Sequence, residues 1–119
     1  MTRDEVRGEI FESLERTHIP LTLRAGIVRY LFDGVRPGHF LEAVISNDLF
    51  GAMGRADENS RAGLFAICGF FYNEVPAPCF GSPAKMEVWL ERSESSKRLR
   101  DRCLGISGEG PPDTEEQTK

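Results

Sequence analysis

Long apolar segments are missing from this chain of 119 residues. No run approaches the roughly 20 apolar residues needed to cross a bilayer, so we expect no membrane span. The N-terminus, from Met1 to Glu5, carries acidic residues where a secretion signal would be positively charged and then apolar. The sequence therefore predicts a cytoplasmic protein.

Cysteine and histidine are scarce and widely spaced. The three cysteines, Cys68, Cys79 and Cys103, form no CxxC pair, and both His18 and His39 are isolated. An odd cysteine count without a secretion signal argues against a disulfide framework. Zinc sites need ligands paired at short spacing. We therefore expect no metal and no cofactor.

An excess of positive charge is also lacking, since the chain has a net charge of −4. Proteins that depend on phosphate contacts with nucleic acid carry a strongly basic face. One small basic patch exists, but acidic neighbours dilute it; it consists of Lys97, Arg98, Arg100 and Arg102. Nucleic acid is thus disfavoured as a partner, and a small DNA-binding regulator is the second alternative function.

Aromatic residues are concentrated between Ile19 and Arg92, a block that holds seven of the eight Phe, both Tyr and the only Trp. This predicts a helical core domain over residues 19–92, preceded by an N-terminal amphipathic helix over 1–18. The polar extension over 93–119 has little to bury, so we expect disorder from about residue 105. The predicted fold is all-α: a compact bundle of four to six short helices with a disordered C-terminal tail.

Capping signals set the helix boundaries in the first half of the chain. Thr2 opens a capping box, and that helix should end near Thr17. A second helix is predicted over Leu21–Asp33, with Gly34 as its C-terminal glycine. From about residue 39 to 56 we expect two short helices with a break near Asn47 and Asp48. Asp48 should be the N-cap of the second helix.

Two further helices are predicted in the second half. Residues 57–74 should form one continuous helix that is apolar on most sides, and so the central element of the core. Pro76–Gly81 reads as an extended loop. Ser82 and Pro83 then begin a helix that buries Trp89, and Ser93–Cys103 could prolong it with a basic surface.

A contact surface is predicted at the end of the 57–74 helix and in the loop after it, over residues 72–80. Tyr72, Asn73 and Glu74 come just before the proline loop, and Trp89 could reach the same place. Aromatic groups with a polar edge are common binding anchors. Ordinary packing is the competing interpretation of these side chains.

Polar residues around two helix boundaries form a second candidate set: Asn47, Asp48 and Arg55, with Asp57 beside them. Helix capping and ion pairing explain them without a function, and a polar binding surface beside an apolar groove explains them with one. A pocket for a nucleotide would instead require basic side chains to converge near aromatic rings. The candidates are Arg24, Arg29, Arg55 and Lys85.

An enzyme is the least favoured class. Cys79 lies in a loop that looks exposed and could be approached by His39, but a cysteine nucleophile needs an oriented base and an oxyanion site that no motif supplies. We expect Cys79 to be a plain loop cysteine and Cys68 to be part of the core. No catalytic residue is assigned.

Several short phrases, in this order and spacing, resemble a family of small uncharacterised proteins encoded by bacteriophages and prophages. The phrases are Tyr30–Gly34, Pro37–Leu41, Asn47–Leu49, Arg55–Asp57, Phe71–Glu74 and Gly81–Pro83, ending at Trp89. The resemblance covers about residues 19–91. It implies a phage setting, where small accessory proteins often act by binding a host protein or sequestering a ligand.

The favoured function is therefore a non-enzymatic phage or prophage accessory protein that binds a bacterial host protein and so inhibits a host defence system. The alternative is a small-ligand binder that sequesters a nucleotide or a cyclic nucleotide signal. Both would act in the bacterial cytoplasm. Whether the protein forms a homo-oligomer, and whether the first helix packs on its own chain or on a neighbour, stays open.

Overall fold

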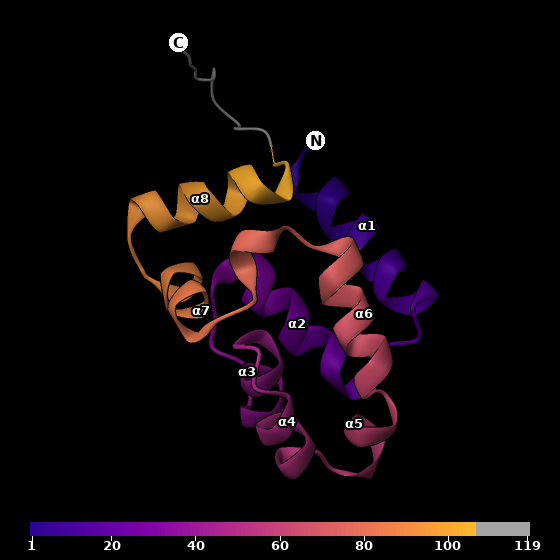
Figure 1. The fold of residues 1–119 in the computed structure, drawn as a ribbon. Coiled ribbons are helices and arrows are strands. Elements are labelled where there is room, and N and C mark those ends of the chain that lie inside the picture. Colours follow the sequence, from indigo (N-terminus) through magenta and orange to yellow (C-terminus); the bar gives the residue numbers. More distant parts are fainter. Residues whose placement is uncertain (107–119) are drawn as a thin grey trace.

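Eight α-helices and one short 3-10 turn make up residues 1–106, the part of the chain that the computed structural model describes (Figure 1). The described residues contain no strand, so the all-α prediction is confirmed. The elements are α1 (Arg3–Arg16), α2 (Leu21–Asp33), α3 (His39–Ile45), α4 (Leu49–Arg55), α5 (Glu58–Ala62), α6 (Leu64–Glu74), η1 (Ala77–Cys79), α7 (Pro83–Leu90) and α8 (Glu94–Leu104).

The predicted helix boundaries hold wherever a capping group sets them. Thr2 and Glu5 form the expected capping box of α1, and Gly34 ends α2 with φ at 64°. Asp48 caps α4 by accepting a hydrogen bond from Gly51 N at 2.9 Å, and Ser82 caps α7 in the same way. A side chain that binds free backbone amides fixes a helix start locally, so these boundaries can be read from the sequence.

The predicted number of helices, four to six, is wrong because two expected helices are divided. Residues 57–74 break at Gly63, where the backbone leaves helical geometry and a Cβ atom would lie 2.8 Å from Pro20 Cγ. Glycine has low helix propensity, and close packing against Pro20 leaves no room for a side chain. Likewise α8 does not prolong α7, because Glu91 is extended and Ser93 caps a new helix.

The centre of the molecule is α2 rather than the predicted 57–74 segment. In Figure 1, α2 lies between α1, α3 and α6. It buries more large side chains than any other described helix: Ile27, Val28, Tyr30, Leu31 and Phe32. By contrast, α6 buries its Ile67, Phe70 and Phe71 and leaves its opposite side exposed.

The N-terminal helix packs on its own chain, against α2 and α6. Val6, Ile10 and Leu14, the predicted apolar stripe, are all buried in the common core. Arg3 ties the helix to α2 by donating to Phe32 O at 3.1 Å and pairing with Asp33 at 2.5 Å. Residues 1–18 therefore contribute to the same core as residues 19–92.

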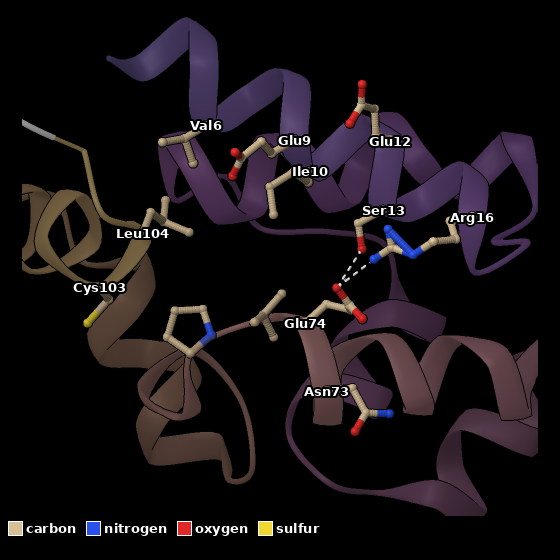
Figure 2. Close-up of a pocket in the computed structure, with 12 residues that line it drawn as sticks. Val6, Glu9, Ile10, Glu12, Ser13, Arg16, Asn73, Glu74, Cys103 and Leu104 are labelled. Atoms are coloured by element: carbon tan, nitrogen blue, oxygen red, sulfur yellow. Dashed lines mark hydrogen bonds and ion pairs between the residues drawn. The ribbon is translucent and has the colours of Figure 1, made fainter. Parts of the chain in front are cut away.

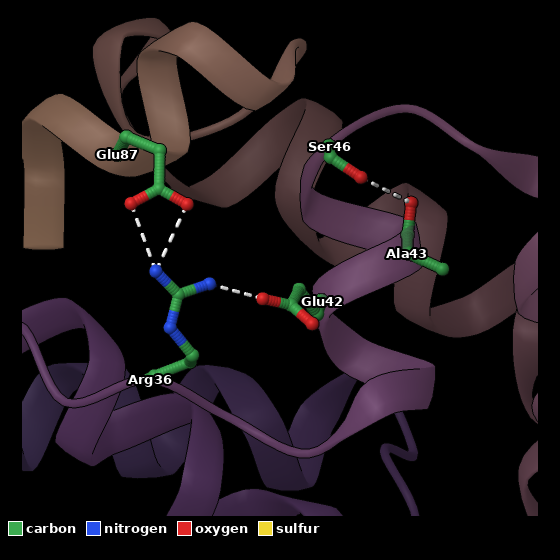
Figure 3. A network of polar contacts seen from close by, with 5 residues as sticks. All are labelled: Arg36, Glu42, Ala43, Ser46 and Glu87. Atoms are coloured by element: carbon green, nitrogen blue, oxygen red, sulfur yellow. Dashed lines mark hydrogen bonds and ion pairs between the residues drawn. The ribbon is translucent and has the colours of Figure 1, made fainter.

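Arg36, in the segment between α2 and α3, connects that segment to α3 and α7. Its guanidinium donates to both carboxylate oxygens of Glu87 on α7, at 2.8 and 2.9 Å, and also to Glu42 on α3 (Figure 3). Exposed ion pairs contribute little individually, but one arginine that bridges two carboxylates fixes the relative position of two helices.

The predicted disordered tail lies outside the described residues from residue 107 onward. Before that point, Gly105 ends α8 with φ at 79°, and Ile106 N donates to Asp101 O at 2.9 Å. None of the described helices is long and apolar enough to cross a membrane.

Candidate functional site: an open apolar groove

An apolar groove of about 440 Å³ opens between α6 and the corner where α3 meets α4. We call it the groove; none of the described residues that line it is charged. Its lining residues are Val44, Asn47, Leu49, Phe65, Cys68, Gly69, Phe71, Tyr72, Asn73 and Phe80. Ligand and peptide sites are typically concave and mainly apolar, with a few polar groups at the edge.

The wall contributed by α6 has the spacing of a helix-packing seam. Phe65, Cys68, Gly69 and Tyr72 stand at positions i, i+3, i+4 and i+7, so they share one face of the helix. Phe65 is 93% exposed and Tyr72 is 80% exposed. Four residues at this spacing form the hole that receives one side chain of a facing helix.

Gly69 makes this hole deep. A Cβ atom at Gly69 would meet only Asn73 Nδ2, at 4.0 Å, so the space above the glycine is open. The backbone of a second helix can therefore approach α6 closely at this point, between the two exposed aromatic rings. Small residues at helix interfaces serve this purpose.

The opposite wall is also rich in exposed apolar side chains. Leu49, the first residue of α4, lines the groove and is half exposed; Phe50 and Met53 on the same short helix are 95% and 45% exposed. Single exposed apolar residues are common, but neighbouring large apolar side chains that are all exposed mark interaction surfaces, and on α4 only Leu49 lines the groove itself.

The structure brings three of the predicted site residues to the groove. Asn47, Tyr72 and Asn73 line it, with the two amides beside apolar walls. Asp48 and Arg55 lie on the far side of α4, where their side chains approach to 3.8 Å and line a neighbouring cavity. The polar set predicted around residues 47–57 is thus divided among three cavities, because Arg55 also lines a third one together with Asp57.

Glu74 faces away from the groove. One of its carboxylate oxygens accepts hydrogen bonds from Ser13 Oγ and Arg16 Nη2, both at 3.0 Å (Figure 2). These bonds hold the pKa of Glu74 below its ordinary value. Glu74 therefore joins α6 to α1 and does not contribute to the predicted contact surface.

Trp89 is fully buried, so the prediction that it helps to form an exposed contact surface is wrong. Its indole Nε1 donates to Tyr30 O at 3.0 Å, and its own carbonyl accepts from Arg100 at 2.6 Å. A buried Trp whose N–H is satisfied by the backbone is a core residue. The buried Arg100, at 7% exposure, likewise does not belong to the predicted basic patch.

Cys79 is not the exposed loop cysteine predicted from the sequence. It is fully buried, its thiol donates to Pro76 O at 3.1 Å, and its carbonyl accepts from the Tyr30 hydroxyl at 2.5 Å. Burial raises the pKa of the Cys79 thiol to about 12, which disfavours the thiolate. His39 lines cavities to which Cys79 does not contribute. Cys68, predicted to be core, is half buried in the groove wall.

The basic residues proposed for a nucleotide site converge only in part. Arg29 and Arg55 line one cavity together with His39. Arg24 instead donates to Ile19 O at 2.8 Å, and Lys85 lies beside Gly81.

Sequence reasoning missed Phe65, Gly69 and Leu49 as groove residues. The signal was present: the 64–74 segment carries two apolar stripes on opposite faces, one of which includes Ile67 and Phe70. A helix with two apolar stripes is either buried on both faces or covered on one, and in this chain the described core covers only the Ile67 and Phe70 face.

Comparison with family models, with curated proteins and with solved structures found no match to this chain.

Proposed function

We propose that this protein is a non-enzymatic binding protein that takes an amphipathic helix of a second protein into the groove. The observation that carries the proposal is the i, i+3, i+4, i+7 seam on α6, with an open glycine at its centre and exposed rings at both ends. A helix fits this shape, because its side chains enter four-residue holes at regular intervals.

The chemistry of the groove selects the apolar face of that helix. Its lining has no charge, and Asn47 and Asn73 supply amide donors and acceptors at the edge. Binding would remove Phe65 and Tyr72 from water, and apolar burial is the main favourable term in protein association.

The resemblance to bacteriophage proteins supports the choice of partner. We propose that the bound helix belongs to a bacterial host protein, that binding takes place in the bacterial cytoplasm, and that it inhibits a host defence system. A helix that is captured on α6 cannot make its normal contacts within its own complex, which gives inhibition without chemistry.

Site-specific cross-linking in a bacterial host tests this proposal. A photoreactive phenylalanine analogue is placed at position 65, and as a matched control at Phe11, which is 42% exposed on α1. We expect position 65, but not position 11, to cross-link to one host protein, with the attached peptide predicted to be an amphipathic helix. A cross-link to a second copy of the chain, or equal labelling from both positions, would overturn the proposal.

A further inference from the structure

A second cavity, separate from the groove, lies where α2 meets the start of α3, the end of α4 and the start of α5. We call it the Arg29–Arg55 cavity; its volume is about 380 Å³, within the range of small-ligand sites. Small residues line part of it: Ala25 and Gly26 on α2, and Gly38, where an added Cβ would meet nothing within 4 Å.

Three side chains that can carry positive charge line this cavity: Arg29, His39 and Arg55, each from a different helix. All three are exposed. Among the described residues that line it, Asp57 alone is acidic, so the two arginines leave these residues with a net positive charge. Net positive charge here is not a general property of the surface, because the cavity between α1 and α6 is lined by three glutamates and one arginine.

The hydrogen-bonding state of the arginines sets this cavity apart. Within the described residues, the guanidinium of Arg29 has no hydrogen-bond or ion-pair partner, although its backbone carbonyl accepts from Val35 N. The guanidinium of Arg55 has only the 3.8 Å contact with Asp48. Arg3 and Arg36, in contrast, are held by carboxylates on neighbouring helices. Two guanidinium groups with free donors line one concavity, and a phosphate accepts the paired N–H bonds that such groups donate.

We propose that the Arg29–Arg55 cavity binds a small sugar phosphate or nucleotide, with its phosphate between the two arginines. Asp57 limits the choice of ligand. Its carboxylate caps α5 by accepting from Ser60 N at 2.7 Å, and this bond lowers the pKa of Asp57, so the group stays ionised. An anion that filled the cavity would be repelled by it, whereas a ligand with hydroxyl groups beside its phosphate can donate to Asp57.

Isothermal titration calorimetry tests the site with ribose 5-phosphate and adenosine 5′-monophosphate, and with ribose and adenosine as matched probes without phosphate. We expect binding of at least one phosphorylated probe and none of its unphosphorylated counterpart. Arg29→Gln and Arg55→Gln should each weaken binding by about tenfold or more, because each removes charge-assisted hydrogen bonds. Arg98→Gln, an exposed arginine on α8, should leave it unchanged.

Both substituted arginines are exposed, so each variant should have the same Tm as the parent protein. An unchanged Tm shows that a loss of binding does not come from a loss of folding. The proposal is overturned if neither phosphorylated probe binds at millimolar concentration, or if both arginine variants bind as the Arg98→Gln control does. Inorganic phosphate that binds as tightly as the sugar phosphate would overturn the ligand class. No groove residue lines this cavity. If the phosphate site is refuted, the proposed helix binding in the groove is unaffected, and if helix binding is refuted, the phosphate site is unaffected.

Discussion

Replacing Gly69 with leucine should make the protein more stable and at the same time strongly weaken partner binding. Gly69 lies inside α6, and a Cβ atom added there would meet only Asn73 Nδ2, at 4.0 Å, so the position has room for a side chain. Leucine has a higher helix propensity than glycine by about 0.8 kcal/mol, which should raise the Tm by about 3–6 °C. The same side chain fills the hole that the partner helix would occupy.

The expected loss of affinity follows from the two rings beside the hole. Phe65 and Tyr72, at 93% and 80% exposure, offer about 360 Å² together, and complete burial of that area is worth about 9 kcal/mol at 25 cal/mol per Å². If the leucine prevents the partner from covering one third of this area, the binding free energy is weaker by about 3 kcal/mol, and the Kd rises about 100-fold.

Gly8→Leu is the matched control. Gly8 lies inside α1, is exposed, and has nothing within 4 Å of an added Cβ, so it gains the same helix propensity far from the groove. Differential scanning calorimetry should show a higher Tm for both variants. In pull-downs from the bacterial host, quantified by mass spectrometry, the partner should be retained by Gly8→Leu and lost from Gly69→Leu. Equal recovery of the partner by both variants would refute the reasoning.

Two further predictions concern groups away from the groove. Tyr30→Phe removes the buried hydroxyl that donates to Cys79 O, so urea unfolding should show that the free energy of unfolding falls by about 1–2 kcal/mol. Tyr72→Phe, the control on the surface, should change that free energy by less than about 0.5 kcal/mol. Similar losses in the two variants would contradict a stabilising role of the buried hydrogen bond. For Glu74, whose folded-state pKa is held low by Arg16, the stabilisation is complete above the unfolded pKa of about 4.5 and is lost as pH falls through the folded value. Unfolding free energies of Glu74→Gln measured between pH 7 and pH 3 should therefore fall less steeply than those of the parent, and parallel curves would count against this assignment.

Local capping chemistry made much of the fold predictable. The starts of α1, α4, α5 and α7 and the end of α2 depend on a hydroxyl, a carboxylate or a glycine within a few residues of the boundary, so the sequence contains the whole interaction. The break at Gly63 depends instead on Pro20, 43 positions earlier in the chain, which packs against the glycine. A contact at that separation cannot be inferred from the local pattern.

The candidate site was only partly predictable for the same reason. An aromatic ring on an amphipathic helix can face the core or the solvent, and the neighbours decide which. Trp89 is buried because Tyr30 and Arg100, on α2 and α8, satisfy its polar groups, whereas Tyr72 on α6 is left outside. The spacing of Tyr72 to Phe65 and Gly69 was readable, but the absence of a covering helix in the described chain was not.

The ion pair between α1 and α8 has a practical consequence. Arg3 lies 3.7 Å from Asp101, so the first and last helices meet at one edge of the molecule, while α4 lies toward the opposite edge (Figure 1). A fluorophore, a solid support or a fused protein attached at residue 1 would therefore lie at the edge opposite to α4, whose Leu49 lines the groove. Immobilised through its first residue, the protein would keep α4 on the side away from the support.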